Sequence, residues 1–176
     1  MTVYRPREDS FLLQDHIEDL NLKDHDVLDM GTGSGIIAMK AAEKGAEVLA
    51  ADINPEALQN AEKKAIEKEL SDKIEFVRSD LFENIDRKFD LILFNPPYLP
   101  GNKGLGDEEI WRGGEKGIEV TRRFLESASK YLKDQGKILV VMSSRADYEP
   151  LIKDYDLEII ESKKIWFETL YLARSK

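Results

Sequence analysis

Short apolar runs alternate with segments of helical spacing along the first 155 residues of the chain. Runs rich in Val, Ile, Leu and Phe are typical of buried strands, and apolar residues three or four apart are typical of surface helices. The strands predicted in this way cover 27–30, 47–52, 74–77, 90–94 and 137–142. The predicted helices cover about 10–20, 36–44, 55–69, 118–132 and 146–154. Such alternation gives a parallel sheet with helices on both faces.

The two final apolar runs, 157–160 and 169–173, have only a short connection, in which 163–167 is expected to be partly extended. Because this connection cannot contain a crossover helix, the two runs predict an antiparallel hairpin at one edge of the sheet. The expected fold is α/β, with a Rossmann-like, seven-stranded and mostly parallel sheet. No repeat or linker marks a second domain, so we expect one domain over 1–176, with a short N-terminal extension and helix over about 1–21.

Composition excludes several classes of protein. The chain has 35 acidic and 26 basic residues, and its net charge of −9 argues against direct binding to nucleic acid. It has no cysteine and only two histidines, so no metal site is predicted. No stretch is apolar enough to span a membrane, and the first nine residues lack the apolar run of a signal peptide. We therefore expect a cytoplasmic protein without membrane contact.

The first candidate site is the turn Asp29-Met30-Gly31-Thr32-Gly33-Ser34-Gly35, between a predicted strand and a predicted helix. Glycines let a ligand approach the backbone closely, and a helix N-terminus favours negative charge. A dinucleotide fingerprint would need glycine where Ile36 stands, so the turn is not typical of an NAD site. Taken alone, the pattern also suits a tight turn without a ligand.

Two carboxylates follow the next two predicted strands. Asp52 stands about 20 residues beyond the glycine turn, where an acidic residue can accept both hydroxyls of a ribose. It could instead cap the following helix, but Asn54 already provides a cap there, with Pro55 at the first helical position. Asp80 can accept a bond from an adenine amino group while Leu81 covers the ring, the alternative being an ordinary loop carboxylate.

The strand at 90–94 ends abruptly at Asn95-Pro96-Pro97-Tyr98. Proline has no N–H and fixes φ, so the pair ends the strand and holds Asn95 extended. The Asn95 side-chain oxygen and the Pro96 carbonyl could accept both N–H groups of a planar nitrogen, orient its lone pair and stabilise the charge that develops as it attacks. Tyr98 could pack against the substrate plane. The alternative is a proline-ended strand without a catalytic role.

Together these motifs resemble those of a class I S-adenosylmethionine-dependent methyltransferase and, within that class, the HemK family of protein glutamine N5-methyltransferases. The segment Tyr4-Arg5-Pro6-Arg7-Glu8-Asp9-Ser10 is similar to the N-terminal Pro-x-Glu-Asp-Ser/Thr segment of the archaeal and eukaryotic branch. The segment Trp111-Arg112-Gly113-Gly114-Glu115-x-Gly117 resembles its Trp-x-Gly-Gly-x-x-Gly loop. The resemblance covers nearly the whole chain, although amino-methylating nucleic acid enzymes share Asn-Pro-Pro-Tyr.

The resemblance implies a set of roles for residues of this chain. Those implied to bind S-adenosyl-L-methionine are Glu8, Asp9, Ser10, Asp29, Gly31, Thr32, Gly33, Gly35, Asp52, Ile53, Asp80, Leu81 and Asn95. Those implied in catalysis are Asn95, Pro96, Pro97 and Tyr98, and those implied to contact substrate are Tyr98, Trp111 and Arg112.

The resemblance also implies a substrate and a partner. The family methylates the glutamine of Gly-Gly-Gln in class I translation termination factors, and its short branch usually works with a small activator subunit that often binds zinc. The sequence contains no counterpart of the separate N-terminal helical domain of bacterial members. A partner subunit could supply the surface that this domain provides.

Alternatives to these roles stay open at this stage. The Glu8-Asp9-Ser10 segment also suits a capped helix start, Trp111 could pack under the glycine-rich loop, and Arg7 and Arg112 could be solvated charges. The stretch 99–117 holds six of the eleven glycines, and a loop this long usually serves a function. An N6-adenine-type DNA or RNA methyltransferase is the second candidate function, weakened by the acidic charge. A non-catalytic cofactor-binding scaffold is the third, and the intact Asn95–Tyr98 motif argues against it.

Overall fold

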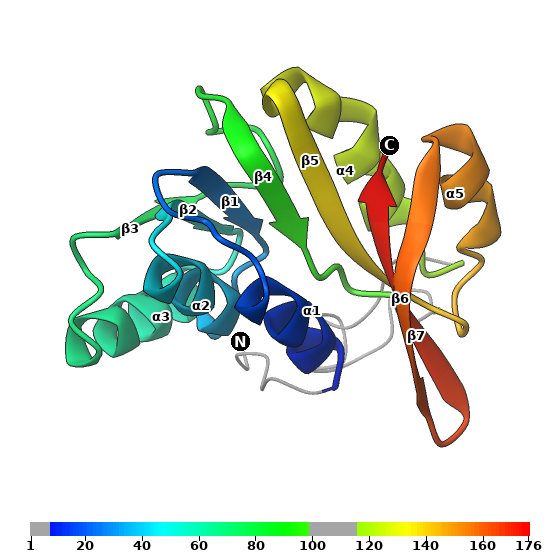
Figure 1. The fold of residues 1–176 in the computed structure, drawn as a ribbon, viewed down its shortest axis with the longest axis horizontal. Coiled ribbons are helices and arrows are strands. Elements are labelled where there is room, and N and C mark those ends of the chain that lie inside the picture. The colour runs from blue at the N-terminus through cyan, green and yellow to red at the C-terminus, as the bar shows by residue number, and fades with distance from the viewer. Residues whose placement is uncertain (1–7, 99–115) are drawn as a thin grey trace.

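The computed structural model describes residues 8–98 and 116–176. In this part of the chain, seven strands form one sheet in the order β3-β2-β1-β4-β5-β7-β6 (Figure 1). The strands are β1 (Asp26–Met30), β2 (Glu47–Asp52), β3 (Ile74–Arg78), β4 (Phe89–Phe94), β5 (Leu132–Ser143), β6 (Leu157–Ile165) and β7 (Glu168–Ser175). The first five pair in parallel, whereas β7 is antiparallel to both β5 and β6. The predicted α/β fold, including its edge hairpin, is confirmed.

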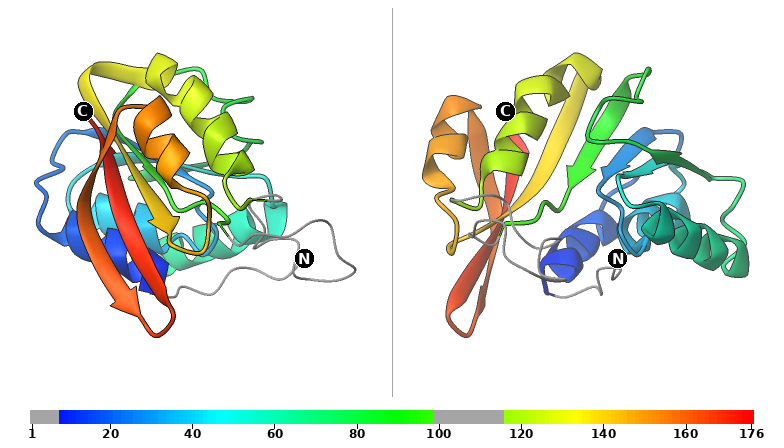
Figure 2. Two further views of the ribbon diagram at one scale, coloured as in Figure 1. Left: turned by 90° about the vertical axis from the view of Figure 1, so that its right-hand side faces the viewer. Right: turned by 180° about the vertical axis from the view of Figure 1, so that it is seen from behind.

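Helices cover both faces of this sheet (Figure 2). They are α1 (Glu8–Glu18), α2 (Ile36–Glu43), α3 (Pro55–Glu67), α4 (Glu119–Ala128) and α5 (Glu149–Asp154), and a short 3-10 turn, η2 (Ser129–Tyr131), follows α4. The pleat of β4 separates two cores, because alternate side chains of a strand point to opposite faces. Leu91 and Leu93 pack with α1 and α2, whereas Ile92 and Phe94 pack with α4 and α5.

The boundary between α4 and β5 differs from the prediction. The sequence predicts a helix to residue 132 and a strand from 137, but α4 ends at Ala128 and β5 begins at Leu132. The Tyr131 ring stacks on Phe82 with centroids 4.4 Å apart, and Leu132 pairs with Phe89 before a register shift in β5. These partners are distant in sequence, so helical spacing alone could not reveal that the chain leaves the helix here.

Three smaller expectations also need correction. The strands of the hairpin are longer than predicted, since β6 continues to Ile165 and β7 begins at Glu168. Helix α5 begins at Glu149 rather than residue 146, with Pro150 in its first turn. Asp9 and Ser10 lie within α1 and therefore do not cap its start. The predicted cap of α3 is confirmed, because the Asn54 side chain accepts a hydrogen bond of 3.0 Å from the Glu56 N–H.

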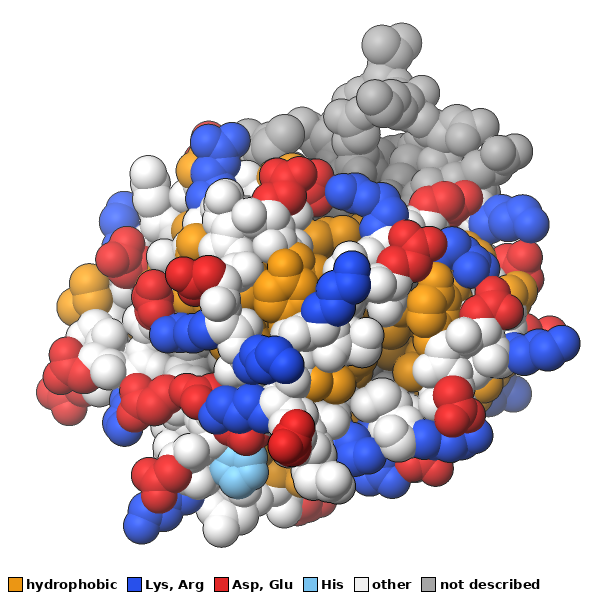
Figure 3. Space-filling view, turned by 90° about the horizontal axis from the view of Figure 1, so that it is seen from above, with side chains coloured by type: hydrophobic (Ala, Val, Ile, Leu, Met, Phe, Trp, Pro, Cys, Tyr) orange, Lys and Arg blue, Asp and Glu red, His pale blue; other side chains and the backbone are white. Residues whose placement is uncertain are grey.

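Charges of both signs are interspersed on one face of the molecule. On the face seen from above, acidic and basic side chains stand next to one another in all parts that the grey atoms leave visible (Figure 3). Ion pairs also occur between charged side chains of the described residues, such as those of Lys133 with Asp26 and with Asp90. No helix within 8–98 and 116–176 is long and apolar enough to cross a membrane.

A close contact at Gly35 fixes α2 against α3. Gly35 precedes α2 with φ +78°, and a Cβ atom built on it would lie 2.8 Å from the Cβ of Ala61. A side chain at position 35 would therefore meet both backbone strain and a clash with α3.

We predict that Gly35→Ala lowers the free energy of unfolding by at least about 2 kcal/mol, because strain and overpacking add. Urea unfolding followed by circular dichroism measures the change. In an Ala61→Gly background the clash with the Ala61 methyl group disappears, and the cost of Gly35→Ala should fall. If Gly35→Ala lowers the free energy of unfolding equally in both backgrounds, the contact with Ala61 is not the cause of the loss.

Candidate active site

The candidate site lies at the carboxyl edge of the parallel strands. β1 and β4 are neighbours in the sheet, but the chain after β1 continues to β2 on one side and the chain after β4 continues to β5 on the other. The two connections therefore separate at this edge. Open α/β sheets bind ligands at such a point. The segments that meet there are the glycine turn after β1, Asp52 at the end of β2 and Asn95 just after β4.

Asp29 holds the glycine turn in place through two hydrogen bonds. Its buried carboxylate accepts a 2.6 Å hydrogen bond from the Thr32 hydroxyl and a 3.0 Å bond from the Ala38 N–H, which joins the turn to the first turn of α2. Burial raises the pKa of Asp29 to about 7, and the two hydrogen bonds oppose that shift. In this structure Asp29 therefore positions the turn.

The turn itself runs close under the edge of β4. Gly31, Gly33 and Gly35 all have positive φ, at +66°, +51° and +78°. A Cβ atom at Gly31 would come within 3.3 Å of the Phe94 ring, so a side chain there would crowd the end of β4. The absence of side chains leaves the backbone of the turn open to close approach by a ligand.

Asp52 joins the end of β2 to this turn. One carboxylate oxygen accepts from the Gly33 N–H and the other from the Asn54 N–H, each at 2.8 Å. Burial raises the pKa of Asp52, and these backbone donors lower it. Each oxygen keeps acceptor capacity for a further donor. Beside it, the apolar side chain of Ile53 is 59% exposed, which suits contact with an apolar ligand face.

Asp80 lies close to the same region. The Ser79 N–H donates to the Asp52 carbonyl over 3.0 Å, so the segment after β3 follows the end of β2. The Asp80 carboxylate forms an ion pair of 3.3 Å with the guanidinium of Arg123 on α4. Leu81, with φ +49°, packs against the core that lies under α4 and α5. Sequence reasoning missed Arg123, because an exposed arginine on a helix gives no signal of its partner.

Helix α1 binds the segment that follows β4. The Asn95 amide nitrogen donates to the Ser10 hydroxyl over 3.3 Å, and the Tyr98 hydroxyl donates to the Asp9 carboxylate over 3.0 Å. Asp9 and Ser10 are both buried. The structure therefore brings residues 9–10 and 95–98 together. Glu8 lies slightly apart and forms an ion pair of 2.6 Å with Lys163 on β6.

The oxygen atom of the Asn95 side-chain amide is the buried polar side-chain atom of the described residues that lacks a hydrogen-bond partner. Asn95 Oδ1 is buried and has no hydrogen-bond partner among the described residues. Leaving a buried acceptor unpaired costs about 1–3 kcal/mol. Because Ser10 holds the Asn95 nitrogen, the amide oxygen is left for a donor from outside the described chain.

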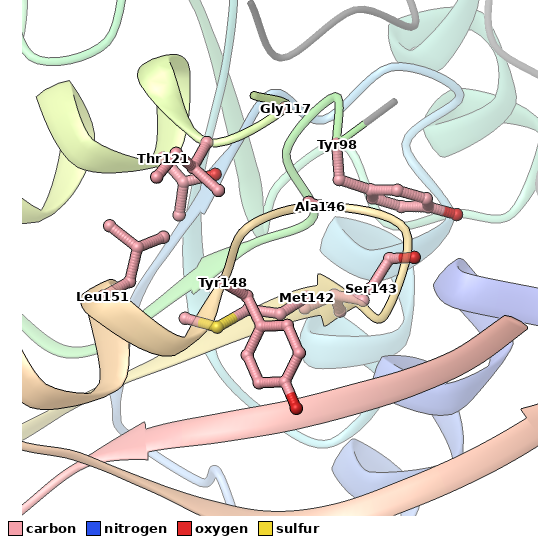
Figure 4. Close-up of a pocket in the computed structure, with 10 residues that line it drawn as sticks. Tyr98, Gly117, Thr121, Met142, Ser143, Ala146, Tyr148 and Leu151 are labelled. Carbon is pink, nitrogen blue, oxygen red and sulfur yellow. The ribbon is translucent and has the colours of Figure 1, made fainter. Parts of the chain in front are cut away.

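A small, mainly apolar cavity lies beside Tyr98 (Figure 4). Its walls come from α4, from the end of β5 and from the segment before α5, and they include Thr121, Met142, Ser143 and Tyr148. Sequence reasoning did not assign a site role to these residues, of which Thr121 lies on α4 and the other three lie at or after the carboxyl end of β5. The predicted substrate residues Trp111 and Arg112, and also Arg7, lie outside the described residues.

Comparison with known proteins defines the class. Residues 8–164 match the family model of the methyltransferase small domain. Among solved structures, the Thermus thermophilus 16S rRNA methyltransferase RsmC, in complex with AdoMet and guanosine, superposes with a TM-score of 0.72 at 23% identity. That match covers 98% of this chain and 44% of the other, and it shows the fold alone. The fold and the family model together define a Rossmann-like methyltransferase.

Relatives with higher identity define the family more closely. A Methanocaldococcus jannaschii protein assigned as a protein N5-glutamine methyltransferase is 39% identical, over 98% of this chain and 91% of its own length. A chain of the E. cuniculi Mtq2–Trm112 complex, which is described as responsible for the methylation of the translation termination factor eRF1, superposes with a TM-score of 0.80 at 27% identity, over 100% of this chain and 99% of that one. The release factor glutamine methyltransferase of Streptococcus pneumoniae is 37% identical over 76% of this chain, which spans 51% of that relative. The chain belongs to the family of protein N5-glutamine methyltransferases.

The buried carboxyl of Asp29 predicts a pH-dependent stability. Its pKa rises from 3.8 to about 7 on folding, so the folded state binds the proton more tightly than the unfolded chain. The contribution of Asp29 to the free energy of unfolding is therefore complete below about pH 4 and is lost as the pH rises towards about 7.

We predict that Asp29→Asn gains stability relative to the wild type as the pH rises through this window, since Asn carries no proton to lose. Urea unfolding of both proteins at several pH values between about 4 and about 8 measures the difference. A difference in unfolding free energy that stays constant with pH would contradict the raised pKa.

Proposed function

We propose that this protein transfers a methyl group from S-adenosyl-L-methionine to the side-chain nitrogen of a glutamine, and that this glutamine belongs to the Gly-Gly-Gln motif of a class I translation termination factor. The observation that carries the proposal is Asn95 Oδ1 at the carboxyl edge of the sheet, which is buried and has no hydrogen-bond partner within 8–98 and 116–176. An amide N–H of the substrate would satisfy this acceptor, which otherwise remains a cost to the fold.

The segment after β4 would bind both hydrogens of the substrate nitrogen. Asn95 Oδ1 accepts one N–H, and the Pro96 carbonyl accepts the other. A glutamine nitrogen is a poor nucleophile because its lone pair is delocalised into the carbonyl. Two fixed acceptors orient the nitrogen and stabilise the positive charge that grows on it, without reorganising during the reaction.

Helix α1 would hold these groups in place. Ser10 fixes the rotation of the Asn95 amide through its nitrogen, so that the oxygen points to the substrate. Asp9 holds the Tyr98 hydroxyl, so that the ring can lie against the plane of the glutamine amide. The Pro96-Pro97 pair restricts the backbone between them. These contacts support the catalytic roles proposed for Asn95, Pro96, Pro97 and Tyr98.

The residues at the glycine turn fit S-adenosyl-L-methionine. The turn at Gly31 and Gly33 is free of side chains, the Asp52 oxygens keep acceptor capacity for the two hydroxyls of a ribose, and the exposed Ile53 offers an apolar contact for adenine. When bound, the cofactor supplies an electrophilic methyl group. Asp29 and Thr32 keep the shape of the turn through their hydrogen bond.

Further cofactor contacts are proposed on the two sides of this turn. Asp80 would accept from the adenine amino group, for which Arg123 must share or release its carboxylate, and Leu81 would cover the ring. Glu8, Asp9 and Ser10 would border the entrance. Trp111 and Arg112 remain predicted substrate contacts.

Relatives support the choice of substrate and partner. The assigned activity of the M. jannaschii relative and the release factor activity of the S. pneumoniae relative favour a glutamine acceptor. The E. cuniculi complex favours the eRF1-type factor as substrate and a small activator subunit, which the sequence resemblance describes as often zinc-binding. A translation factor would be encountered in the cytoplasm.

We predict that Asn95→Ala lowers kcat for a termination factor by at least about 1,000-fold, because both the acceptor and its positioning are lost. Incubation with labelled S-adenosylmethionine and the termination factor, with any natural partner present, measures transfer of the labelled methyl group to the factor. Cofactor affinity by calorimetry should change little. Asn60→Ala, at an exposed position of α3, is the control and should leave both unchanged.

The same assay separates the competing functions. No transfer to the wild-type factor, or equal transfer to a factor whose Gly-Gly-Gln glutamine is Ala, would sink the proposal. Transfer to RNA or DNA that Asn95→Ala abolishes would favour the N6-adenine alternative. Loss of cofactor binding in Asn95→Ala would assign this residue a structural role.

Ser10 gives a second test of the proposed arrangement. We predict that Ser10→Ala lowers kcat about 10-fold while the KM for S-adenosylmethionine changes little, because the Asn95 amide loses its anchor and rotates. Ser10→Thr keeps a hydroxyl and should restore most of the rate. The exposed Ser71→Ala is the control. A raised KM for the cofactor with unchanged kcat would instead assign Ser10 to cofactor binding.

A further inference from the structure

The tip of the β6–β7 hairpin carries two aromatic side chains in full contact with solvent. Trp166 is 90% exposed and Phe167 is 96% exposed, more than any other large hydrophobic residue in the described part of the chain. The hairpin extends beyond α1 in Figures 1 and 2, and the two residues form its turn. Burying such side chains is favourable, so their exposure needs a reason outside the fold.

The residues of this turn are not those that would make the hairpin most stable. Ile165 pairs with Glu168, which leaves Trp166 and Phe167 as a two-residue hairpin loop. Such loops favour Gly, Asn or Asp, because at least one residue must take positive φ. Here Trp166 takes φ +40°, a region that a bulky side chain rarely adopts. The turn therefore keeps an aromatic residue despite local strain, which points to a role in recognition.

The tip lies at the same edge of the sheet as Asn95. β7 is antiparallel to β5 and to β6, so β6 runs in the direction of the parallel strands and ends at their carboxyl edge. Glu168, the first residue after the tip, accepts a hydrogen bond from the Ser143 hydroxyl. Ser143 and Tyr98 line one cavity (Figure 4), so the base of the tip is connected to the segment proposed to bind the substrate amide.

Helix α1 ties the hairpin to the same segment from the other side. Lys163 of β6 pairs with Glu8 at 2.6 Å, and Glu161 pairs with His16. The next residues of α1, Asp9 and Ser10, contact Tyr98 and Asn95. Helix α1 thus contacts both the hairpin and the segment that holds Asn95 and Tyr98. These contacts fix the position of the hairpin tip relative to that segment.

We propose that Trp166 and Phe167 dock the folded protein that carries the acceptor glutamine. This inference rests on the proposed function and adds the surface by which that substrate is held. A glutamine amide offers few contacts of its own, so recognition and orientation must come from parts of the substrate remote from the reacting nitrogen. The exposed Lys164 beside the tip suits an apolar patch on the substrate that acidic groups border.

The test replaces the turn by one that the hairpin itself would favour. In Trp166→Gly with Phe167→Ser, glycine suits the positive φ, so the free energy of unfolding should stay equal or rise. Affinity for the termination factor is measured by fluorescence anisotropy in the Asn95→Ala background, with any natural partner present, so that binding is read without turnover. We expect the Kd to rise at least about 10-fold, since exposed Trp and Phe anchors dominate such interfaces.

Control measurements make the outcomes distinct. Ile66 on α3 is 59% exposed, and Ile66→Ser should leave the Kd unchanged. Calorimetry should show unchanged affinity for S-adenosylmethionine in the hairpin variant. An unchanged Kd for the factor overturns the inference. The inference is also overturned if the hairpin variant keeps the Kd for the factor but loses binding to the activator subunit or to anionic lipid vesicles. In that case the tip binds the activator subunit or the lipid surface instead of the factor.

Failure of this inference is separable from failure of the proposed function. If the wild-type protein methylates the factor and the hairpin variant does so with the same kcat/KM and Kd, only the docking role is wrong. If the wild type binds the factor through the hairpin but never methylates its glutamine, the docking role is upheld and the proposed reaction is wrong.

Discussion

The hydrogen bonds between α1 and the segment after β4 are the constraint on which the rest of the site depends. Ser10 holds the nitrogen of the Asn95 amide, and Asp9 holds the Tyr98 hydroxyl. Without the first bond, nothing among the described residues would decide which side of the Asn95 amide points outward. With it, the buried Asn95 oxygen, which has no partner in the described part of the chain, is the atom proposed to accept from the substrate. The two prolines make this arrangement stiff, because they restrict the backbone between the two anchored side chains.

The second half of the site is built by two buried carboxylates that bind backbone N–H groups. Asp29 ties the glycine turn to α2, and Asp52 ties the same turn to the end of β2. Burial opposes the charged form of each, and the hydrogen bonds favour it, so the pKa of each reflects a balance between the two effects. The methyltransferase fold places this turn at the carboxyl edge, next to Asn95. A methyl donor at the turn and an amide at Asn95 would therefore meet at one edge.

Much of this could be predicted from the sequence, because strong local signals mark it. The alternation of apolar runs gave the parallel sheet, and Asn54-Pro55 marked the start of α3. The residues that bind across long separations could not be predicted from local pattern. Arg123 reaches Asp80, Tyr131 stacks on Phe82, and Ser143 bonds to Glu168, and in each pair the partners lie far apart in the chain. The aromatic tip escaped notice for the opposite reason, since Trp166-Phe167 resembles an ordinary apolar strand end until its exposure is known.

The central claim is that Asn95 Oδ1 selects the side-chain nitrogen of a glutamine as methyl acceptor. Tandem mass spectrometry of the termination factor after reaction with the wild-type protein and S-adenosylmethionine tests this claim most directly. The account predicts one added methyl group on the side-chain nitrogen of the Gly-Gly-Gln glutamine. A methyl group on a different residue, or on nucleic acid while the factor stays unmodified, would contradict it.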